Sequence, residues 1–351
     1  MQVNDPKKDI TFLNFNQTNA CLIVGTKAGY SLWRTNPFDQ CTRGFIEHPI
    51  HLCEMFFSTS LLAVVCNDKD ENFTPRVLYL YNTKIDQVIC LLRFNEDIQG
   101  VKLNQQHLVV ILRASIIIYT LEKIEPVCTL DIFFNQTPQS APDLNPNRHS
   151  IAVLCPQRPL LAYPCDPIRG SVCIARLNDP SSSAPGIGDD EETYGSYQVI
   201  EAHDHPVTAL AFNRDGDKLA TASAHGTIVR IWDTNTRKMI TEVKRSKVGK
   251  TATIHSLCFS DDGQLLVVSS SSKTVHIFCI EGERKSETSV ACIYLEKENI
   301  TERMNIASFS SESNYIQLAC ADGNYYHFKM PALGSSNKKC EKASSAKVLG
   351  N

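Results

Sequence analysis

The stretch VTALAFNRDGDKLATASAHGTIVRIWD, residues 207–233, decides the fold because a second stretch, IHSLCFSDDGQLLVVSSSSKTVHIF, residues 254–278, repeats its pattern. Each stretch contains three apolar strands, with an Asp-Gly turn after the first strand and a short polar turn after the second. A repeat of forty-odd residues built of strands is typical of propeller blades. The matching positions, all at an offset of 47 residues, are Phe212 and Phe259, Gly216 and Gly263, Leu219 and Leu266, Ser223 and Ser270, and Thr227 and Thr274.

Five weaker copies follow the same order of strands and turns, at residues 12–33, 54–82, 101–121, 150–177 and 304–330. With the two strong copies they make seven units, and a chain of 351 residues then has about 50 residues for each unit, near known blade lengths. The sequence therefore predicts an all-β fold, a single seven-bladed β-propeller of WD-repeat type over residues 1–331. We expect the N-terminal strand to complete the last blade and close the ring.

Two segments break the repeat. Residues 178–198 are rich in Ser, Pro, Gly and acidic side chains, which predicts a mobile acidic surface loop. Residues 332–351 have no hydrophobic periodicity, which predicts a disordered C-terminal tail.

Composition indicates a soluble globular protein, with 42% hydrophobic and 21% charged residues. The longest apolar runs, such as LVVIL at 108–112, have the length of a strand and cannot span a membrane. The first residues, MQVNDPKKDI, lack the apolar stretch of a secretory signal, so we expect a protein of the cytosol or nucleus. A net charge of −3 provides no general attraction to nucleic acid or to anionic lipid, so any anion site must be a local cluster.

Fourteen cysteines are many for such a chain, but they stand singly, often within apolar runs. No C-x-x-C pair occurs. Buried reduced thiols are favoured over zinc sites or disulfides, because a free cysteine packs like a small hydrophobic residue.

Motifs for catalysis, nucleotide binding and metal binding fail on inspection. Gly249-Lys250-Thr251 has the end of a phosphate-binding P-loop, but Lys244 stands where that loop needs a glycine. His203 and His205 could start a metal site, yet no third or fourth ligand accompanies them. With no nucleophile motif present, we expect no enzyme activity, no cofactor and no metal.

Three strings carry a more specific signature than a generic blade: LLAYPCDPIRGSV (160–172), EAHDHPVTALAFNRDGDKLATASAHGTIVR (201–230) and SLCFSDDGQLLVVSSSSKTVHIF (256–278). They resemble the PROPPIN family, also called the WIPI family. The resemblance implies a seven-bladed propeller that binds phosphatidylinositol 3-phosphate and the 3,5-bisphosphate in autophagy and endolysosomal traffic. It also implies a cytoplasmic protein recruited peripherally to phagophore or endosomal membranes.

The family carries Phe or Leu followed by Arg-Arg-Gly between two of its blades, and the matching residues here are Val243-Lys244-Arg245-Ser246. Successive side chains of an extended segment point to opposite sides, so the two cations can serve two pockets. The resemblance implies that Lys244 turns toward the fifth blade and Arg245 toward the sixth. Carried over residue by residue, the first lipid headgroup site comprises Ser223, Thr227, Arg230, Lys244 and His203. The second comprises Arg245, Ser270, Thr274, His276 and His255.

Hydroxyls and cations of this kind suit a concave site for phosphate oxygens. A plainer interpretation stays open, in which the hydroxyls only cap strands, Arg230 pairs with Asp233 or Glu242, and His276 is a hydrogen-bonded, half-buried histidine.

Two departures from the family motif fall in the site itself. Lys244 keeps the charge of the first arginine but loses the planar fork that grips phosphate, and Ser246 replaces a glycine. We therefore expect a weakened first site and a better preserved second site. Lys247 and Lys250 add positive charge that attracts an anionic bilayer.

The family has a long loop in its sixth blade whose apolar residues enter the membrane. The corresponding segment here is 281–303, and its candidates for membrane insertion are Val290, Ile293, Tyr294 and Leu295. The alternative is that this apolar run is the outer strand of the blade.

The resemblance also implies protein partners. Relatives bind an elongated lipid-transfer protein of autophagy through loops of blades two and three, which makes residues 67–76 a candidate contact. Two functions from different classes remain: a phosphoinositide-dependent membrane effector that also acts as a protein scaffold in autophagosome formation, and a propeller scaffold with weak or lost lipid binding. In both cases we expect a monomer that binds no nucleic acid.

Overall fold

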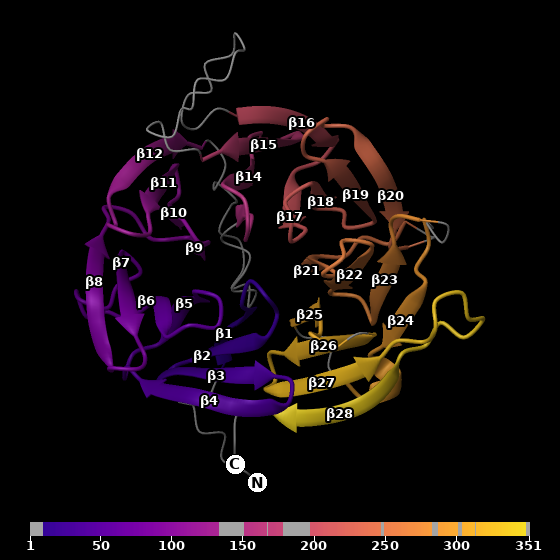
Figure 1. The fold of residues 1–351 in the computed structure, drawn as a ribbon, viewed down its shortest axis with the longest axis horizontal. Coiled ribbons are helices and arrows are strands. Elements are labelled where there is room, and N and C mark those ends of the chain that lie inside the picture. The colour runs from indigo at the N-terminus through magenta and orange to yellow at the C-terminus, as the bar shows by residue number, and fades with distance from the viewer. Residues whose placement is uncertain are drawn as a thin grey trace.

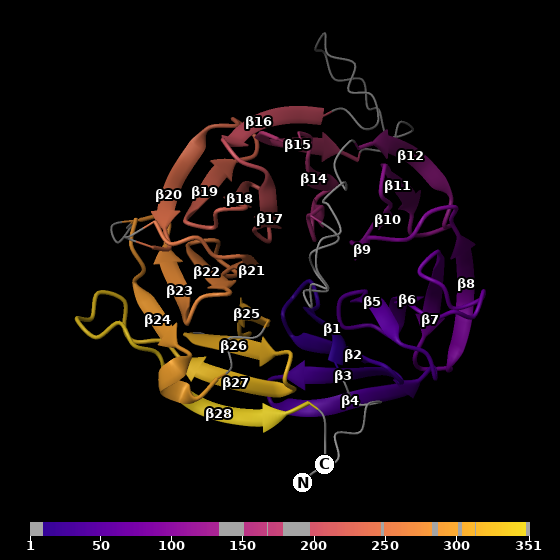
Figure 2. The same cartoon turned by 180° about the vertical axis from the view of Figure 1, so that it is seen from behind.

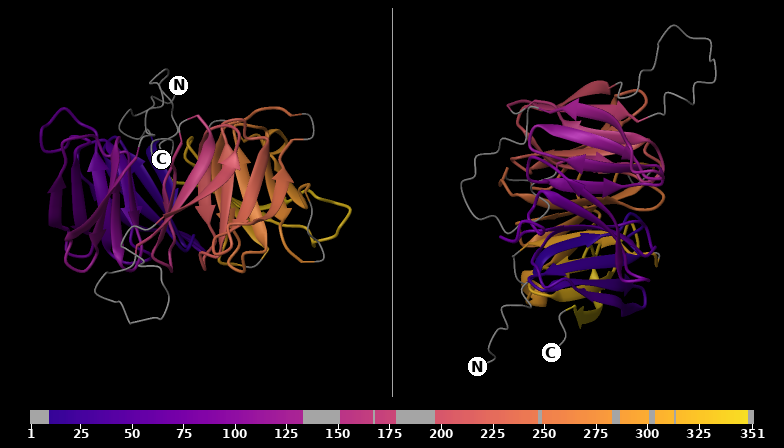
Figure 3. Two further views of the ribbon diagram at one scale, coloured as in Figure 1. Left: turned by 90° about the horizontal axis from the view of Figure 1, so that it is seen from above. Right: turned by 90° about the vertical axis from the view of Figure 1, so that its left-hand side faces the viewer.

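Seven four-stranded antiparallel sheets form a closed ring (Figure 1). The computed structural model describes residues 10–132, 151–166, 168–177, 197–246, 249–282, 287–300, 304–312 and 314–348. Each sheet contains four strands that follow one another in the chain, from the innermost strand to the outermost. The predicted seven-bladed propeller is confirmed. Seen from behind and from its sides, the ring is a flattened disc (Figures 2 and 3).

The first four blades take up the chain from residue 10 to residue 203. Blade one comprises β1 (Ile10–Phe15), β2 (Cys21–Thr26), β3 (Gly29–Thr35) and β4 (Phe38–Phe45). Blade two comprises β5 (Ile50–Met55), β6 (Leu61–Cys66), β7 (Val77–Asn82) and β8 (Gln87–Arg93). Blade three comprises β9 (Gly100–Leu103), β10 (His107–Ile111), β11 (Ser115–Thr120) and β12 (Pro126–Asp131). Blade four comprises β13 (Val153–Leu154), β14 (Leu160–Pro164), β15 (Gly170–Arg176) and β16 (Tyr197–His203).

The last three blades include the two strong sequence repeats. Blade five comprises β17 (Val207–Phe212), β18 (Lys218–Ser223), β19 (Ile228–Asp233) and β20 (Met239–Lys244). Blade six comprises β21 (Ile254–Phe259), β22 (Leu265–Ser270), β23 (Thr274–Cys279) and β24 (Ala291–Tyr294), followed by the short 3-10 helix η3 (Glu296–Glu298). Blade seven comprises β25 (Asn305–Phe309), β26 (Tyr315–Cys320), β27 (Asn324–Lys329) and β28 (Glu341–Lys347).

The Asp-Gly turn of the repeat is a place where the fold demands glycine. Gly216, between β17 and β18, has a φ of 70°, in the left-handed region that other residues rarely adopt. A Cβ atom there would also lie 2.6 Å from the Sγ atom of Cys155 in blade four. The turn therefore fixes the hairpin and lets blade five pack closely against its neighbour.

Apolar clusters between neighbouring blades hold the ring together. The cluster that closes it joins Leu13 and Leu22 of blade one to Ile306 and Tyr325 of blade seven. The ring of Tyr325 stacks on Phe38 with centroids 4.1 Å apart, and its hydroxyl donates a hydrogen bond to the Thr35 carbonyl oxygen at 3.3 Å. Blade seven thus seals against blade one by side-chain packing.

Two predictions about the chain ends are wrong. The strand β1 is the innermost strand of blade one and does not complete blade seven. That place belongs to β28, which lies within the segment predicted to be a disordered tail. The reason is that β28, EKASSAK, is the outermost strand, so almost all of its side chains are exposed and it carries no apolar alternation.

The predicted acidic loop at 178–198 lies outside the described residues, apart from residues 197 and 198, which begin β16. The cysteines are free thiols, and most are buried or half-buried in the strands.

Candidate functional site

The predicted site lies at the seam between blades five and six. Here the turn between β18 and β19 meets the end of β20 and the segment that leads into β21 (Figure 1). The Ala252 amide donates a hydrogen bond to the His225 carbonyl oxygen at 3.1 Å, which fixes the two segments against each other. Gly226, with a φ of 58°, allows this approach, because a Cβ atom there would stand 1.9 Å from the Ala252 carbonyl oxygen.

The side chains at the end of β20 alternate as an extended segment requires. Val243 is buried in the core between blades five and six, Lys244 is exposed, and Arg245 is only 8% exposed. The two neighbouring cations therefore occupy different surroundings. Their directions are the reverse of those implied by the resemblance, because Lys244 contacts Glu287 of the blade-six loop and Arg245 contacts the Gly226 carbonyl oxygen of blade five.

Arg245 joins the segments of the seam. Its Nε–H donates to the Gly226 carbonyl oxygen at 2.6 Å, an Nη2–H donates to the Lys250 carbonyl oxygen, and its amide donates to the Thr227 carbonyl oxygen at 2.9 Å. Burial lowers the pKa of the guanidinium. Within the described residues these partners are carbonyl groups and not carboxylates, so the positive charge of Arg245 is not neutralised.

The other members of the second predicted site come from β22 and β23. The hydroxyl of Ser270 hydrogen-bonds that of Ser272 at 2.8 Å, and Ser272 in turn donates to the Thr274 carbonyl oxygen at 3.1 Å. His276 has its Nδ1 atom 3.7 Å from the Cys292 Sγ atom. Burial, and then the charge of Arg245, lower the pKa of His276 to about 4. The structure therefore brings His276 within electrostatic reach of Arg245.

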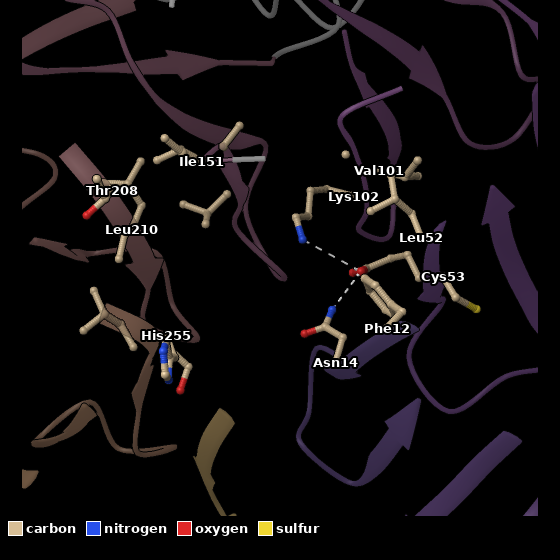
Figure 4. Close-up of a pocket in the computed structure, with 17 residues that line it drawn as sticks. Phe12, Asn14, Leu52, Cys53, Val101, Lys102, Ile151, Thr208, Leu210 and His255 are labelled. Atoms are coloured by element: carbon tan, nitrogen blue, oxygen red, sulfur yellow. Dashed lines mark hydrogen bonds and ion pairs between the residues drawn. The ribbon is translucent and has the colours of Figure 1, made fainter. Parts of the chain in front are cut away.

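His255 does not belong with these residues, and its assignment to the second site is wrong. It lies on β21, the innermost strand of blade six, and its ring lines a central cavity of about 200 Å³ (Figure 4). The strand register shifts between Ile254 and Ser256, at the position of this residue. Its Nδ1 atom is buried without a hydrogen-bond partner in the described part of the chain, and burial lowers the pKa of the ring to about 4.

The same cavity has a polar wall opposite His255 (Figure 4). The carboxylate of Glu54 accepts hydrogen bonds from Asn14 at 3.1 Å and Gln17 at 3.2 Å, and Lys102 lies 3.9 Å away. Burial raises the pKa of Glu54, against the opposing effect of Lys102. These contacts join the innermost strands of blades one, two and three.

The first predicted site faces blade four. The Nε2 atom of His203 lies 2.9 Å from the Thr221 hydroxyl, and burial, with a smaller effect of Arg230, lowers the His203 pKa to about 4. Arg230 donates to the Ala202 carbonyl oxygen at 2.8 Å and forms an ion pair with Glu242 at 3.3 Å. The plainer interpretation of Arg230 is therefore the observed one.

Of the hydroxyls predicted for this site, Ser223 is buried and Thr227 is half-buried, both beside the turn that Arg245 holds. Lys244 is the exposed cation, and its Nζ atom lies 2.7 Å from a carboxylate oxygen of Glu287. Glu287 is not among the residues that the sequence assigns to either site. No pattern along the chain indicates that this loop reaches Lys244, because the contact joins residues 43 positions apart.

The membrane-insertion assignment is wrong for two of its four residues. Ile293 is 1% exposed and Leu295 is fully buried, because β24 packs into the core shared by blades six and seven. Val290 packs against the same core, and the half-buried Tyr294 has its ring 4.9 Å from the Nζ atom of Lys297. The alternative, an outer strand of the blade, is the observed structure.

The candidate partner loop, residues 67–76, connects β6 and β7. Its Asp68 pairs with His48 at 2.7 Å, and the ring of Phe73 stacks on the same histidine with centroids 3.6 Å apart. Much of the loop is exposed. Its contact with a partner stays a prediction.

A family model described as PROPPIN matches residues 9–315 of the chain. The chain belongs to the PROPPIN family. It is 36% identical over 278 residues to autophagy-related protein 18 of Mycosarcoma maydis, an alignment that covers 76% of this chain and 58% of the relative. Against autophagy-related protein 18 of Saccharomyces cerevisiae it is 32% identical over 337 residues, covering 79% of this chain and 63% of the relative. The PROPPIN chain thus spans about three-fifths of the length of these curated relatives.

Solved structures agree on the fold of this PROPPIN. The structure of Kluyveromyces lactis Hsv2 with complete loop 6CD superposes with a TM-score of 0.78 at 18% identity, covering 97% of this chain and 99% of that one. The structure of KlAtg21 with the coiled-coil of AgAtg16 gives a TM-score of 0.71 at 23% identity with the same coverage.

Among the described residues, no helix has the length and apolar character needed to cross a membrane. Groups of three or more histidine, cysteine or acidic side chains placed to hold a metal ion do not occur among the same residues.

Proposed function

We propose that this PROPPIN chain binds the headgroup of phosphatidylinositol 3-phosphate or the 3,5-bisphosphate at the seam of blades five and six. In this proposal the propeller lies edge-on against a phagophore or endosomal membrane. It acts there as a membrane effector and protein scaffold in autophagosome formation. The proposed role in autophagy is inferred from the names of the relatives. The proposed lipid ligand is inferred from the family resemblance and from the chemistry of the seam.

The observation that supports the proposal most is the surroundings of Arg245. A guanidinium has five N–H donors, and the two that donate within the seam reach carbonyl oxygens, which leave the positive charge intact. His276 lies within electrostatic reach, and the hydroxyls of Ser270 and Ser272 gather at the neighbouring turn. A preorganised cation beside hydroxyl donors is the arrangement that phosphate oxygens favour.

Liposome flotation tests this proposal. The wild-type chain is expected to float with phosphatidylcholine vesicles that contain phosphatidylinositol 3-phosphate, and the Lys244→Ala, Arg245→Ala double variant is expected to remain at the bottom. Because Arg245 also joins parts of the seam, Arg245→Lys serves as a second variant that keeps the charge. Lys329→Ala, which removes an exposed cation from blade seven, is the matched control. If the double variant floats as well as the wild type, or if the wild type does not float, the proposal is overturned.

A second candidate function is a propeller scaffold with weak or lost lipid binding. Two observations favour it: Lys244 is paired with Glu287, and Arg230 is paired with Glu242. Both ion pairs remove positive charge from the first predicted site. Negligible flotation of the wild type, with retained binding of a protein partner, would support this candidate.

A protein partner is proposed for both functions. One of the solved relatives is a complex of KlAtg21 with a coiled-coil of AgAtg16. For this chain we retain the 67–76 loop as the contact for an autophagy lipid-transfer protein. Reversing the exposed charges with Lys69→Glu and Glu71→Lys should weaken that complex in calorimetry, and unchanged affinity would contradict the contact.

A further inference from the structure

The segment between β23 and β24 contacts blade five through Glu287. Its last residues are anchored at three points: the Lys244 amide donates to the Glu287 carbonyl oxygen at 2.7 Å, the Lys338 ammonium donates to that of Ser289 at 2.8 Å, and the Val290 amide donates to that of Ile277 at 2.8 Å. Backbone hydrogen bonds therefore determine where Glu287 stands, independently of its side chain.

The side chain of Glu287 adds an ion pair to this anchor. A carboxylate oxygen lies 2.7 Å from the Lys244 Nζ atom, and the side chains are 45% exposed for Lys244 and 61% exposed for Glu287. Their hydrogen bond raises the pKa of Lys244 and lowers the pKa of Glu287. Such a carboxylate oxygen takes the position that an oxygen of a bound phosphate would take on the same ammonium.

Glu287 pairs with Lys244, and Lys244 is the exposed cation of the predicted sites. Arg230 is already paired with Glu242, and Arg245 is buried beneath its carbonyl partners. A ligand arriving from solvent therefore meets Lys244 first, and it meets that cation already neutralised by Glu287.

We propose that Glu287 is an internal competitor for Lys244 that lowers the affinity of the first site for phosphate monoesters. This inference rests on the proposed function and adds the residue that sets its affinity. Binding requires the carboxylate to move aside while the backbone hydrogen bond keeps the loop in place. Because the ion pair is exposed and screened by water, its removal should strengthen binding only about two- to fivefold.

The test compares Glu287→Gln with the wild type in titrations of phosphatidylcholine vesicles containing phosphatidylinositol 3-phosphate. Glutamine keeps the size of the side chain and removes its charge. We expect the variant to bind about two- to fivefold more tightly, with a gain that shrinks as salt rises. The gain should vanish when Lys244→Ala is added, and Glu341→Gln on the exposed strand β28 should give no gain.

Two further arms separate the sources of the effect. Free inositol 1,3-bisphosphate reports the headgroup without a bilayer, and vesicles with phosphatidylserine in place of the phosphoinositide report general attraction to anionic lipid. An equal gain on phosphatidylserine would overturn the inference, since any added positive charge would explain it.

The outcomes also separate this inference from the proposed function. If the wild type binds and Glu287→Gln binds no more tightly, the competitor is refuted while phosphoinositide binding stands. If Glu287→Gln binds and the wild type does not, the competitor is supported, because it then accounts for the weak site. If neither binds, both proposals fail.

Discussion

Replacing Arg245 by methionine tests whether this side chain holds the seam as well as carrying charge. Methionine matches much of its length but donates no hydrogen bonds. The Gly226 carbonyl would then lose its partner in a buried place, whereas the Lys250 carbonyl, on an exposed residue, can turn to water. A hydrogen bond from a charged donor contributes about 1.5–3 kcal/mol, and relief from burying a charge offsets part of it. We expect a net loss of about 2 kcal/mol in the free energy of unfolding.

The assay is urea unfolding followed by tryptophan fluorescence. The chain has two tryptophans, and Trp33→Phe leaves Trp232 of blade five as the single reporter. Arg245→Lys should fall between wild type and methionine, because an ammonium can reach one carbonyl but lacks the planar fork. Lys244→Ala, at the exposed neighbour, should leave the unfolding midpoint unchanged. A methionine variant as stable as the wild type would refute the reasoning, since the seam would then gain nothing from these hydrogen bonds.

Three more predictions concern the ring. Burial lowers the pKa of His203, His255 and His276 to about 4, so the unfolded chain, with a histidine pKa of about 6.5, takes up protons first as pH falls. Stability should be constant above about pH 7 and fall between about pH 6.5 and 4, more shallowly for His255→Asn, and a flat urea midpoint across this range would contradict it. Tyr325→Phe removes the hydroxyl, whose single proton is within reach of the Gln317 Oε1 atom at 2.9 Å and the Thr35 carbonyl oxygen at 3.3 Å, and it should cost about 1 kcal/mol in chemical unfolding; no loss would argue against a stabilising role of this hydroxyl. A chain ending at residue 336 lacks β28 and leaves β27 as an unpaired edge, so it should melt earlier and aggregate in light scattering, and an unchanged melting curve would contradict that role of β28.

The sequence was sufficient for the blades where apolar alternation and turns coincide. Residues 207–233 and 254–278 predict blades five and six from their apolar strands and Asp-Gly turns. In the structure the second strand of each blade is buried, and the glycine of each turn has a positive φ. The polar strand β28 gave no such signal, since an outermost strand needs only backbone pairing. The closure of the ring was mispredicted for the same reason.

The site was partly predictable, because alternation along an extended segment is local. This alternation predicts that Lys244 and Arg245 point in different directions, and in the structure Lys244 is exposed and Arg245 is buried. Alternation could not predict the environment of His255, because this side chain lines a cavity formed with residues from the other blades, which lie far away in the sequence. Nor could it separate a membrane wedge from the buried face of β24, because both are short apolar runs.

The most direct test of lipid recognition at the seam is a crystal structure of the chain with short-chain phosphatidylinositol 3-phosphate. A phosphate group within hydrogen-bonding distance of the Arg245 guanidinium, between the turn at Gly226 and the side chain of His276, is the predicted result. A headgroup bound in the central cavity beside His255 and Lys102, or anywhere away from this seam, would contradict it.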